Sequence, residues 1–153
     1  MDAALTYLGF RARTVREVER YLDEKQYGEF EIMQVVDRLT ELGLLNDAQY
    51  AADFLDSRLR TKPVSRRILR EQLYAHELPR PIIDEALARI SDETELKNAV
   101  AVAEKYAAQY GSYERIEQER RITKRMLSRG FSYDTVQSAM RHIDLEAAEE
   151  PEA

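Results

Sequence analysis

The sequence predicts an all-α protein, in which three tandem three-helix modules of the helix-turn-helix kind form an elongated, curved rod. Two observations support this fold class. An apolar stripe with the spacing i, i+3, i+4, i+7, which marks one face of an α-helix, occurs three times, at intervals of 51 and 53 residues. Its copies are Ile32, Val35, Val36 and Leu39, then Ile83, Ala86, Leu87 and Ile90, and finally Val136, Ala139, Met140 and Ile143. No segment alternates with period two over a useful length, so no β-sheet is expected.

The first module is assigned to residues 1–45, with helices expected at 2–10, 14–25 and 30–42. Thr14 and Glu17 have the spacing of a capping box, in which each side chain accepts a backbone N–H at a helix start. Gly28 and Gly43 follow periodic runs, as glycines at helix ends do. Acidic side chains dominate the faces that this module is expected to expose.

The second module is assigned to residues 46–92, with helices expected at 47–61, 65–76 and 80–90. Asn46 and Gln49 have the capping-box spacing at the start of the first of these helices. Pro63 and Pro79 fall between the helices, where a missing N–H is tolerated.

The third module is assigned to residues 93–145, with helices expected at 93–110, 114–129 and 132–144. Asp92 and Glu95 resemble a further capping box, and Ser132 is expected to cap the last helix. Residues 146–153 form an acidic tail of Ala, Glu and Pro, which is expected to be disordered.

The composition excludes several kinds of chemistry. The 153 residues include no cysteine, which excludes disulfides and thiolate metal sites, and only two histidines, His76 and His142. No glycine-rich phosphate loop or clustered aspartate pattern is present, so we expect no enzyme, no cofactor and no metal. His76 is interpreted as favouring a helix C-terminus electrostatically. No apolar run reaches the about 20 residues of a membrane span, and no signal peptide is seen, so a cytoplasmic protein without membrane contact is expected.

Basic residues gather in two runs although the net charge is −6. The run in residues 58–70 contains no acidic residue, whereas Glu117 and Glu119 dilute the run in residues 115–129. Cations beside aromatic rings suit phosphates and stacked bases, and the alternative interpretation is a solvated face without function. The candidate DNA- or filament-binding residues are Arg58, Lys62, Arg66, Arg67, Arg70, Arg121, Lys124, Arg125 and Arg129.

Helical spacing places these candidates on particular faces. Arg67 and Arg70 should share a face with Tyr74, opposite an apolar face formed by Leu69 and Leu73. Three arginines of the second run have the spacing i, i+4, i+8 and are expected to form one exposed stripe, namely Arg121, Arg125 and Arg129. The tyrosines at 106 and 110 are interpreted as packing between helices.

Three motifs resemble those of one bacterial protein family. The stretch from Gly43 to Asp47 with Tyr50-Ala51 is similar to a Gly-x-Leu-Asp-Asp…Phe-Ala junction. The stretch from Arg66 to Leu73 is similar to an Arg-Ile-x-x-Glu-Leu helix, and Arg129-Gly130-Phe131-Ser132 matches an Arg-Gly-Phe-Ser motif. Their order and spacing, over nearly the whole chain, resemble the RecX family, whose members regulate the RecA recombinase.

This resemblance implies a non-catalytic regulator made of three-helix repeats. Such a protein binds the RecA–DNA filament, lies along its groove, and restrains filament growth, ATP hydrolysis, strand exchange and stimulated repressor cleavage. The sequence departs from the family at Lys62-Pro63-Val64-Ser65, where Lys-Gly-x-Gly-Pro is common, and in its acidic net charge. We therefore expect a monomer for which contact with RecA dominates, and which binds single-stranded and double-stranded DNA only weakly by itself.

Two alternatives belong to other functional classes. A free-standing helix-turn-helix protein would read duplex DNA with Arg66, Arg67 and Arg70 at a helix N-terminus, although no dimerisation heptad accompanies them. A helical adaptor for another protein would bind neither DNA nor RecA, and its basic runs would be incidental.

Overall fold

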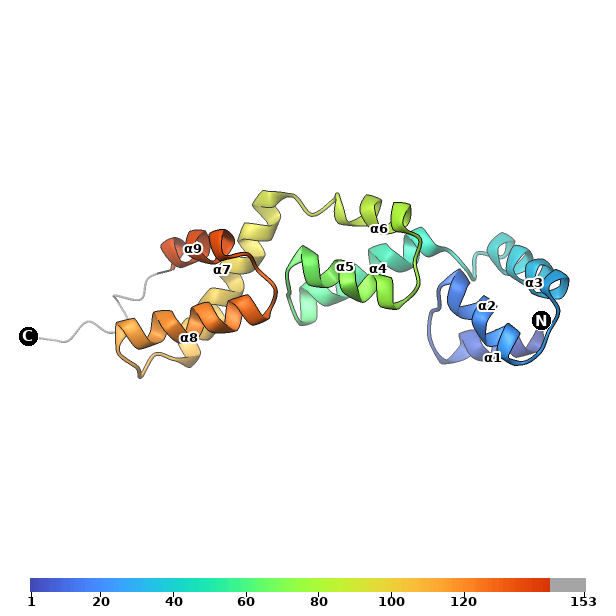
Figure 1. The fold of residues 1–153 in the computed structure, drawn as a ribbon, viewed down its shortest axis with the longest axis horizontal. Helices are drawn as coiled ribbons and strands as arrows, with labels where there is room; N and C mark the ends of the chain where they lie inside the picture. Colours follow the sequence, from blue (N-terminus) through green and yellow to red (C-terminus); the bar gives the residue numbers. More distant parts are fainter. Residues whose placement is uncertain (144–153) are drawn as a thin grey trace, which may run out of the picture. The chain divides into compact units, whose positions relative to one another are not determined.

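The computed structural model describes residues 1–143, and this part of the chain contains nine α-helices and no strand (Figure 1). The all-α prediction is therefore confirmed. The helices are α1 (Asp2–Phe10), α2 (Val15–Glu24), α3 (Glu29–Glu41), α4 (Asp47–Thr61), α5 (Arg66–Ala75), α6 (Arg80–Leu87), α7 (Asp92–Gln109), α8 (Arg115–Ser128) and α9 (Tyr133–His142). The acidic tail predicted at 146–153 lies outside the described residues.

The chain divides into two compact units, and the boundaries between them fall within α4 and α5. Among the described residues, one unit holds residues 1–56 and 70–87, and the other holds residues 57–69 and 88–143. We call them the N-terminal unit and the C-terminal unit and describe each by itself.

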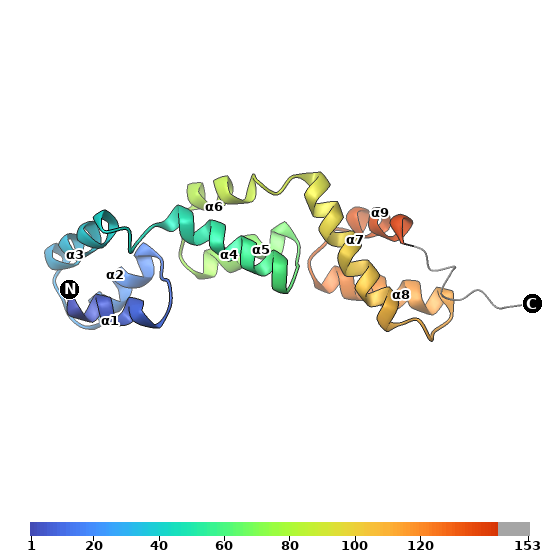
Figure 2. The same cartoon turned by 180° about the vertical axis from the view of Figure 1, so that it is seen from behind.

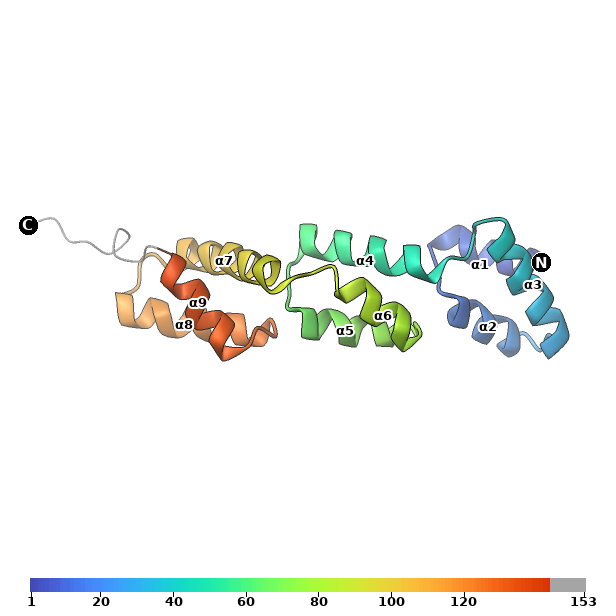
Figure 3. The same cartoon turned by 90° about the horizontal axis from the view of Figure 1, so that it is seen from above.

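In the N-terminal unit, α2 packs against both α1 and α3 (Figure 3). Apolar side chains from these helices and the following turn form its buried core: Ala4, Val18, Leu22, Ile32, Leu39 and Leu45. The predicted capping box is present, because the Thr14 hydroxyl accepts the Glu17 N–H at 3.2 Å and the Glu17 carboxylate accepts the Thr14 N–H at 3.0 Å. The apolar face of α2 thus packs into a core to which α1 and α3 also contribute side chains.

A polar cluster joins α4 and the end of α5 to the start of α2. His76 Nδ1 lies 3.1 Å from Glu17 Oε2 and 3.0 Å from the Tyr50 hydroxyl, and the Thr14 hydroxyl donates to the His76 carbonyl at 2.8 Å. Asp47 accepts the Val15 N–H at 2.9 Å, and burial raises the pKa of Asp47. His76 does follow a helix end, as expected, but its contacts give it a connecting role.

In the C-terminal unit, α7 packs against both α8 and α9 (Figure 2). Ten buried side chains from these helices and the turns between them pack together: Ala99, Val102, Ala103, Tyr106, Tyr110, Ile122, Met126, Phe131, Val136 and Ala139. Ser132 caps α9 as predicted, since its hydroxyl accepts the Thr135 N–H at 3.1 Å.

Two sequence predictions about helix ends are wrong. The helix expected at 80–90 ends at Leu87, and the Ile90 carbonyl instead accepts a hydrogen bond from the Arg66 guanidinium at 2.9 Å. Helix α7 is capped by Ser91, whose hydroxyl accepts the Thr94 N–H, and not by the expected pair of Asp92 and Glu95.

Candidate nucleic-acid interface

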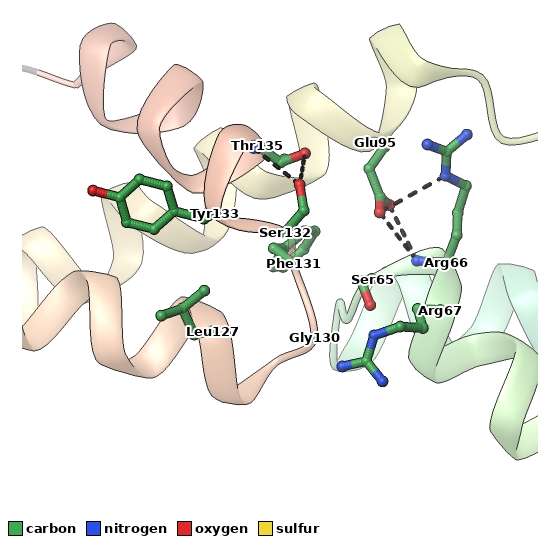
Figure 4. A pocket seen from close by; sticks show the side chains of 10 residues that line it. All are labelled: Ser65, Arg66, Arg67, Glu95, Leu127, Gly130, Phe131, Ser132, Tyr133 and Thr135. Carbon is green, nitrogen blue, oxygen red and sulfur yellow. Dashed lines mark hydrogen bonds and ion pairs between the residues drawn. The ribbon is translucent and has the colours of Figure 1, made fainter.

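Arg66 anchors the start of α5 to the start of α7. Its guanidinium donates to the Ile90 carbonyl at 2.9 Å and to Asp92 Oδ1 at 2.7 Å. Its backbone N–H donates to the Glu95 carboxylate at 3.2 and 3.3 Å, and Figure 4 shows these two side chains facing each other. Glu95 therefore caps α5 from another helix. Burial raises the pKa of Glu95, against the opposing effect of the Arg66 hydrogen bond. Arg66, a candidate DNA contact, thus directs its donors toward its own chain.

The turn between α8 and α9 packs against the connection between α4 and α5. The Arg129 carbonyl accepts the Ser65 N–H at 3.0 Å, and Arg129 Nη1 donates to the Pro63 carbonyl at 3.0 Å. The two basic runs, which lie far apart in sequence, meet at this joint.

Gly130 is required at this joint for two reasons. Its φ of +89° is unfavourable for residues with a side chain. A Cβ atom on Gly130 would also overlap with the Ser65 hydroxyl and the Ile68 side chain. Phe131 is buried in the core beside it. The Arg-Gly-Phe-Ser motif is thus explained as a structural joint, including the cap made by Ser132.

A hollow of about 480 Å³ opens beside this joint. Figure 4 shows Arg67 on one side of it and Leu127 and Tyr133 on the other, with Ser132 and Phe131 between them. Arg67 and Tyr133 are both exposed, Tyr133 by 62%. The hollow therefore offers a cation and an aromatic ring from two elements of the C-terminal unit. Leu127 and Tyr133 were not among the candidate residues that the sequence identified.

Arginines in the last turn and at the C-cap of α8 lie along tyrosines in the last turn and at the C-cap of α7. Arg129 Nε donates to the Tyr106 hydroxyl at 3.2 Å, and Arg125 Nε donates to the Tyr110 hydroxyl at 3.0 Å. The second bond raises the pKa of Arg125. Tyr106 and Tyr110 are buried and stacked, with ring centroids 6.2 Å apart. They pack between helices as predicted, and in addition their hydroxyl groups orient two candidate arginines.

The expected exposed stripe on α8 is only partly exposed. Arg125 and Lys124 are exposed, whereas Arg121 and Arg129 are partly buried. Arg121 lies 4.2 Å from the Tyr113 ring centroid and donates to Glu117 at 2.8 Å. The prediction of one exposed stripe is therefore wrong in detail, because tyrosines cover two of its three members.

Glu117 neutralises the start of the basic run on α8. Its carboxylate accepts hydrogen bonds from Arg120 at 2.9 and 3.2 Å as well as from Arg121. These bonds, with Arg120 first, lower the pKa of Glu117. Glu117, which interrupts the basic run in the sequence, therefore pairs directly with two arginines of that run.

Arg70 differs from the other candidates because it lies in the N-terminal unit. It donates to Asp84 on α6 at 2.5 Å, and this bond raises the pKa of Arg70. Leu69 and Leu73 are fully buried, and Tyr74 is 45% exposed, as the helical wheel predicted. Of the remaining candidates, Lys62 is exposed and Arg58 is partly buried.

The described residues 1–143 contain no group of three or more His, Asp or Glu side chains that could hold a metal ion. None of the helices in this part of the chain is long and apolar enough to cross a membrane.

Three sequence-family models match the chain in order. They describe the first three-helix domain of RecX at residues 1–39, the second at 46–87 and the third at 93–140. Regulatory protein RecX of Lactococcus lactis subsp. cremoris strain SK11 is 32% identical over 152 residues, covering 97% of this chain and 56% of that protein. Its Bacillus subtilis strain 168 counterpart is 30% identical over 151 residues, covering 99% and 57%. The chain thus spans little more than half the length of these relatives.

Two solved structures are similar in fold. The crystal structure of RecX from Lactobacillus salivarius superposes with a TM-score of 0.81 at 28% identity and covers 94% of both chains. A second crystal structure of regulatory protein RecX gives a TM-score of 0.73 at 22% identity, and covers 92% of this chain and 69% of its own.

Proposed function

The chain belongs to the RecX family, and from this premise we propose that it binds the RecA–DNA filament and restrains RecA activity in recombination, repair and the SOS response. The family consists of regulatory proteins and not of enzymes. In this proposal the chain acts as a cytoplasmic monomer that docks into the groove of the filament.

The observation that carries the proposal is the set of exposed cations around the joint between Arg129 and Pro63. Lys62 and Arg67 flank the α4–α5 side of this joint, and Lys124 and Arg125 lie on the helix that leads to the other side. Exposed ammonium and guanidinium groups bind phosphates, and such contacts carry no sequence information. This surface therefore suits the backbone of filament DNA together with acidic surface of the recombinase.

The overall charge supports a filament as the target and not free DNA. A net charge of −6 opposes indiscriminate attraction to nucleic acid, so a local basic surface needs additional protein contacts to hold the chain in place. Charge pairing of this kind speeds association and makes binding fall with salt.

The structure weakens the alternative of a duplex-reading helix-turn-helix protein. That function needs guanidinium groups at the start of α5 that can reach base edges. Arg66 is engaged by Ile90 and Asp92, and Arg70 pairs with Asp84. Only Arg67 remains exposed among the three arginines that this alternative requires.

The proposal is tested by comparing the binding of the labelled chain to preformed RecA filaments, to naked single-stranded DNA and to duplex DNA at one salt concentration. We expect the filament to bind at least about tenfold more tightly than either DNA, a difference of roughly 1.4 kcal/mol. Equal or tighter binding to naked DNA would contradict it.

A further inference from the structure

A groove of about 600 Å³ runs between α2 and α3 in the N-terminal unit, and none of the candidate DNA contacts lines it. Apolar side chains of α3 line it, namely Ile32, Met33 and Val36. Met33 is 52% exposed, although its neighbour Ile32 belongs to the buried core. A flexible thioether side chain in an open groove adapts to the shape of a partner, which is why methionine is common at binding surfaces.

The walls of this groove carry an excess of negative charge. Four carboxylates, Glu19, Asp23, Glu29 and Asp37, line it together with two arginines, Arg16 and Arg20. Both arginines pair with Glu77, and Arg16 also pairs with Glu19. By contrast, Asp23, Glu29 and Asp37 are exposed and form no ion pair with any residue in 1–143. The charge that remains to attract a partner is therefore negative.

The second three-helix domain has an ion pair at the place that corresponds to this groove. Residues 51 positions further along the chain correspond in the repeat, so Glu19 corresponds to Arg70 and Met33 corresponds to Asp84. In the second domain this pair forms an ion pair that joins α5 to α6. In the first domain the same two positions hold a carboxylate and an exposed apolar side chain, which cannot pair with each other.

We propose that the groove between α2 and α3 is a docking site for a cationic amphipathic helix of a partner protein. An apolar residue of that helix would pack on Met33 and Val36, and its Lys or Arg side chains would reach Asp23, Glu29 and Asp37. This inference goes beyond the proposed DNA contacts, because every cation in those contacts except Arg70 lies in the other unit.

The test uses a labelled helical peptide of leucine and lysine as the probe, with a glutamate-for-lysine version as its counterpart. Met33→Glu distinguishes docking from simple charge attraction. It adds a negative charge, which would strengthen simple attraction of a cationic peptide, and it removes an apolar side chain on which a docked peptide would pack. Leu42→Glu is the matched control, because Leu42 is 50% exposed, caps the same helix and does not line the groove.

We expect Met33→Glu to weaken binding of the cationic peptide about tenfold, because docking would bury the new carboxylate against apolar groups. Leu42→Glu should leave the affinity unchanged or slightly higher, Asp37→Asn should lower it, and the acidic peptide should not bind. Circular dichroism verifies that each variant is folded. If Met33→Glu binds the cationic peptide as tightly as the wild-type chain does, or more tightly, the inference is overturned.

Discussion

Arg129 donates a hydrogen bond from Nη1 to the carbonyl of Pro63, 66 residues earlier in the chain, at 3.0 Å. This bond joins the turn before α9 to the connection before α5, and Tyr106 holds the same guanidinium from α7. Three segments of the C-terminal unit are thereby fixed around one arginine. Of the exposed cations proposed to meet DNA, Lys62 lies in one of these segments, and the others lie on the adjoining helices α5 and α8, so their positions depend on the joint.

Gly130→Ala should destabilise the chain by about 2–4 kcal/mol, because a side chain there is strained at positive φ and overlaps with Ser65 and Ile68. Gly9→Ala is the control: Gly9 lies in α1 with open space around it, and alanine favours a helix. Urea unfolding of the two variants measures the difference. Equal stability of Gly130→Ala and the wild-type chain would show that the joint accommodates a side chain at position 130 without strain.

Tyr106→Phe should lower the free energy of unfolding by about 1–2 kcal/mol, because it removes the acceptor of the Arg129 Nε–H while the ring stays buried. Tyr133→Phe, at a 62% exposed position, should have no measurable effect. Urea unfolding again provides the comparison. A loss of the same size in both variants would argue against a specific role for the Tyr106 hydroxyl.

Glu95→Gln should change how stability depends on pH. The pKa of Glu95 is raised in the folded chain, so folding favours its protonated form, and the resulting stabilisation is present below the ordinary value of 4.5 and lost as pH rises through the folded pKa. The wild-type chain should therefore gain stability relative to Glu95→Gln as the pH falls from 7 to 4. Denaturant midpoints at several pH values test this, and a constant difference between the two proteins would contradict it.

Lys124→Glu and Arg67→Glu should each weaken binding to RecA filaments and leave helix content unchanged, because both side chains are exposed. Loss of one phosphate contact should reduce the slope of log affinity against log salt by about 1. Arg38→Glu on α3 is the control, since Arg38 is exposed and lies outside both basic runs. An effect of Arg38→Glu as large as that of the other two would show that only net charge matters.

Much of the fold could be predicted because its determinants are local. The capping box at Thr14 and the cap at Ser132 are set by residues three positions apart, and both are present. The end of α6 could not be predicted, because Ile90 fits the helical period while its carbonyl is bound by Arg66 from another segment. The prediction that Glu95 helps to cap α7 was wrong for the same reason. Glu95 has the spacing of a local cap, but its carboxylate accepts the Arg66 N–H at the start of α5.

The exposure of several candidate residues could be predicted from the sequence, and their partners within the chain could not. Charge runs and helical spacing identify Lys62, Arg67 and Lys124, which the structure places at the surface. Periodicity does not predict contacts between residues far apart in the sequence. Arg66 binds Glu95, 29 positions away, and Arg129 binds Pro63, 66 positions away. Which cations remain available to a partner is therefore decided by tertiary contacts.

The central claim is tested most directly by ATP hydrolysis of the cognate RecA on single-stranded DNA, with this protein added to preformed filaments at substoichiometric to equimolar ratios. We expect a progressive loss of hydrolysis. Because the filaments are formed before the protein is added, this loss distinguishes action on filaments from competition for naked DNA. An unchanged rate up to equimolar protein would contradict it. With tight binding to duplex DNA alone, that result would favour the helix-turn-helix alternative, and with no binding at all it would favour a helical adaptor.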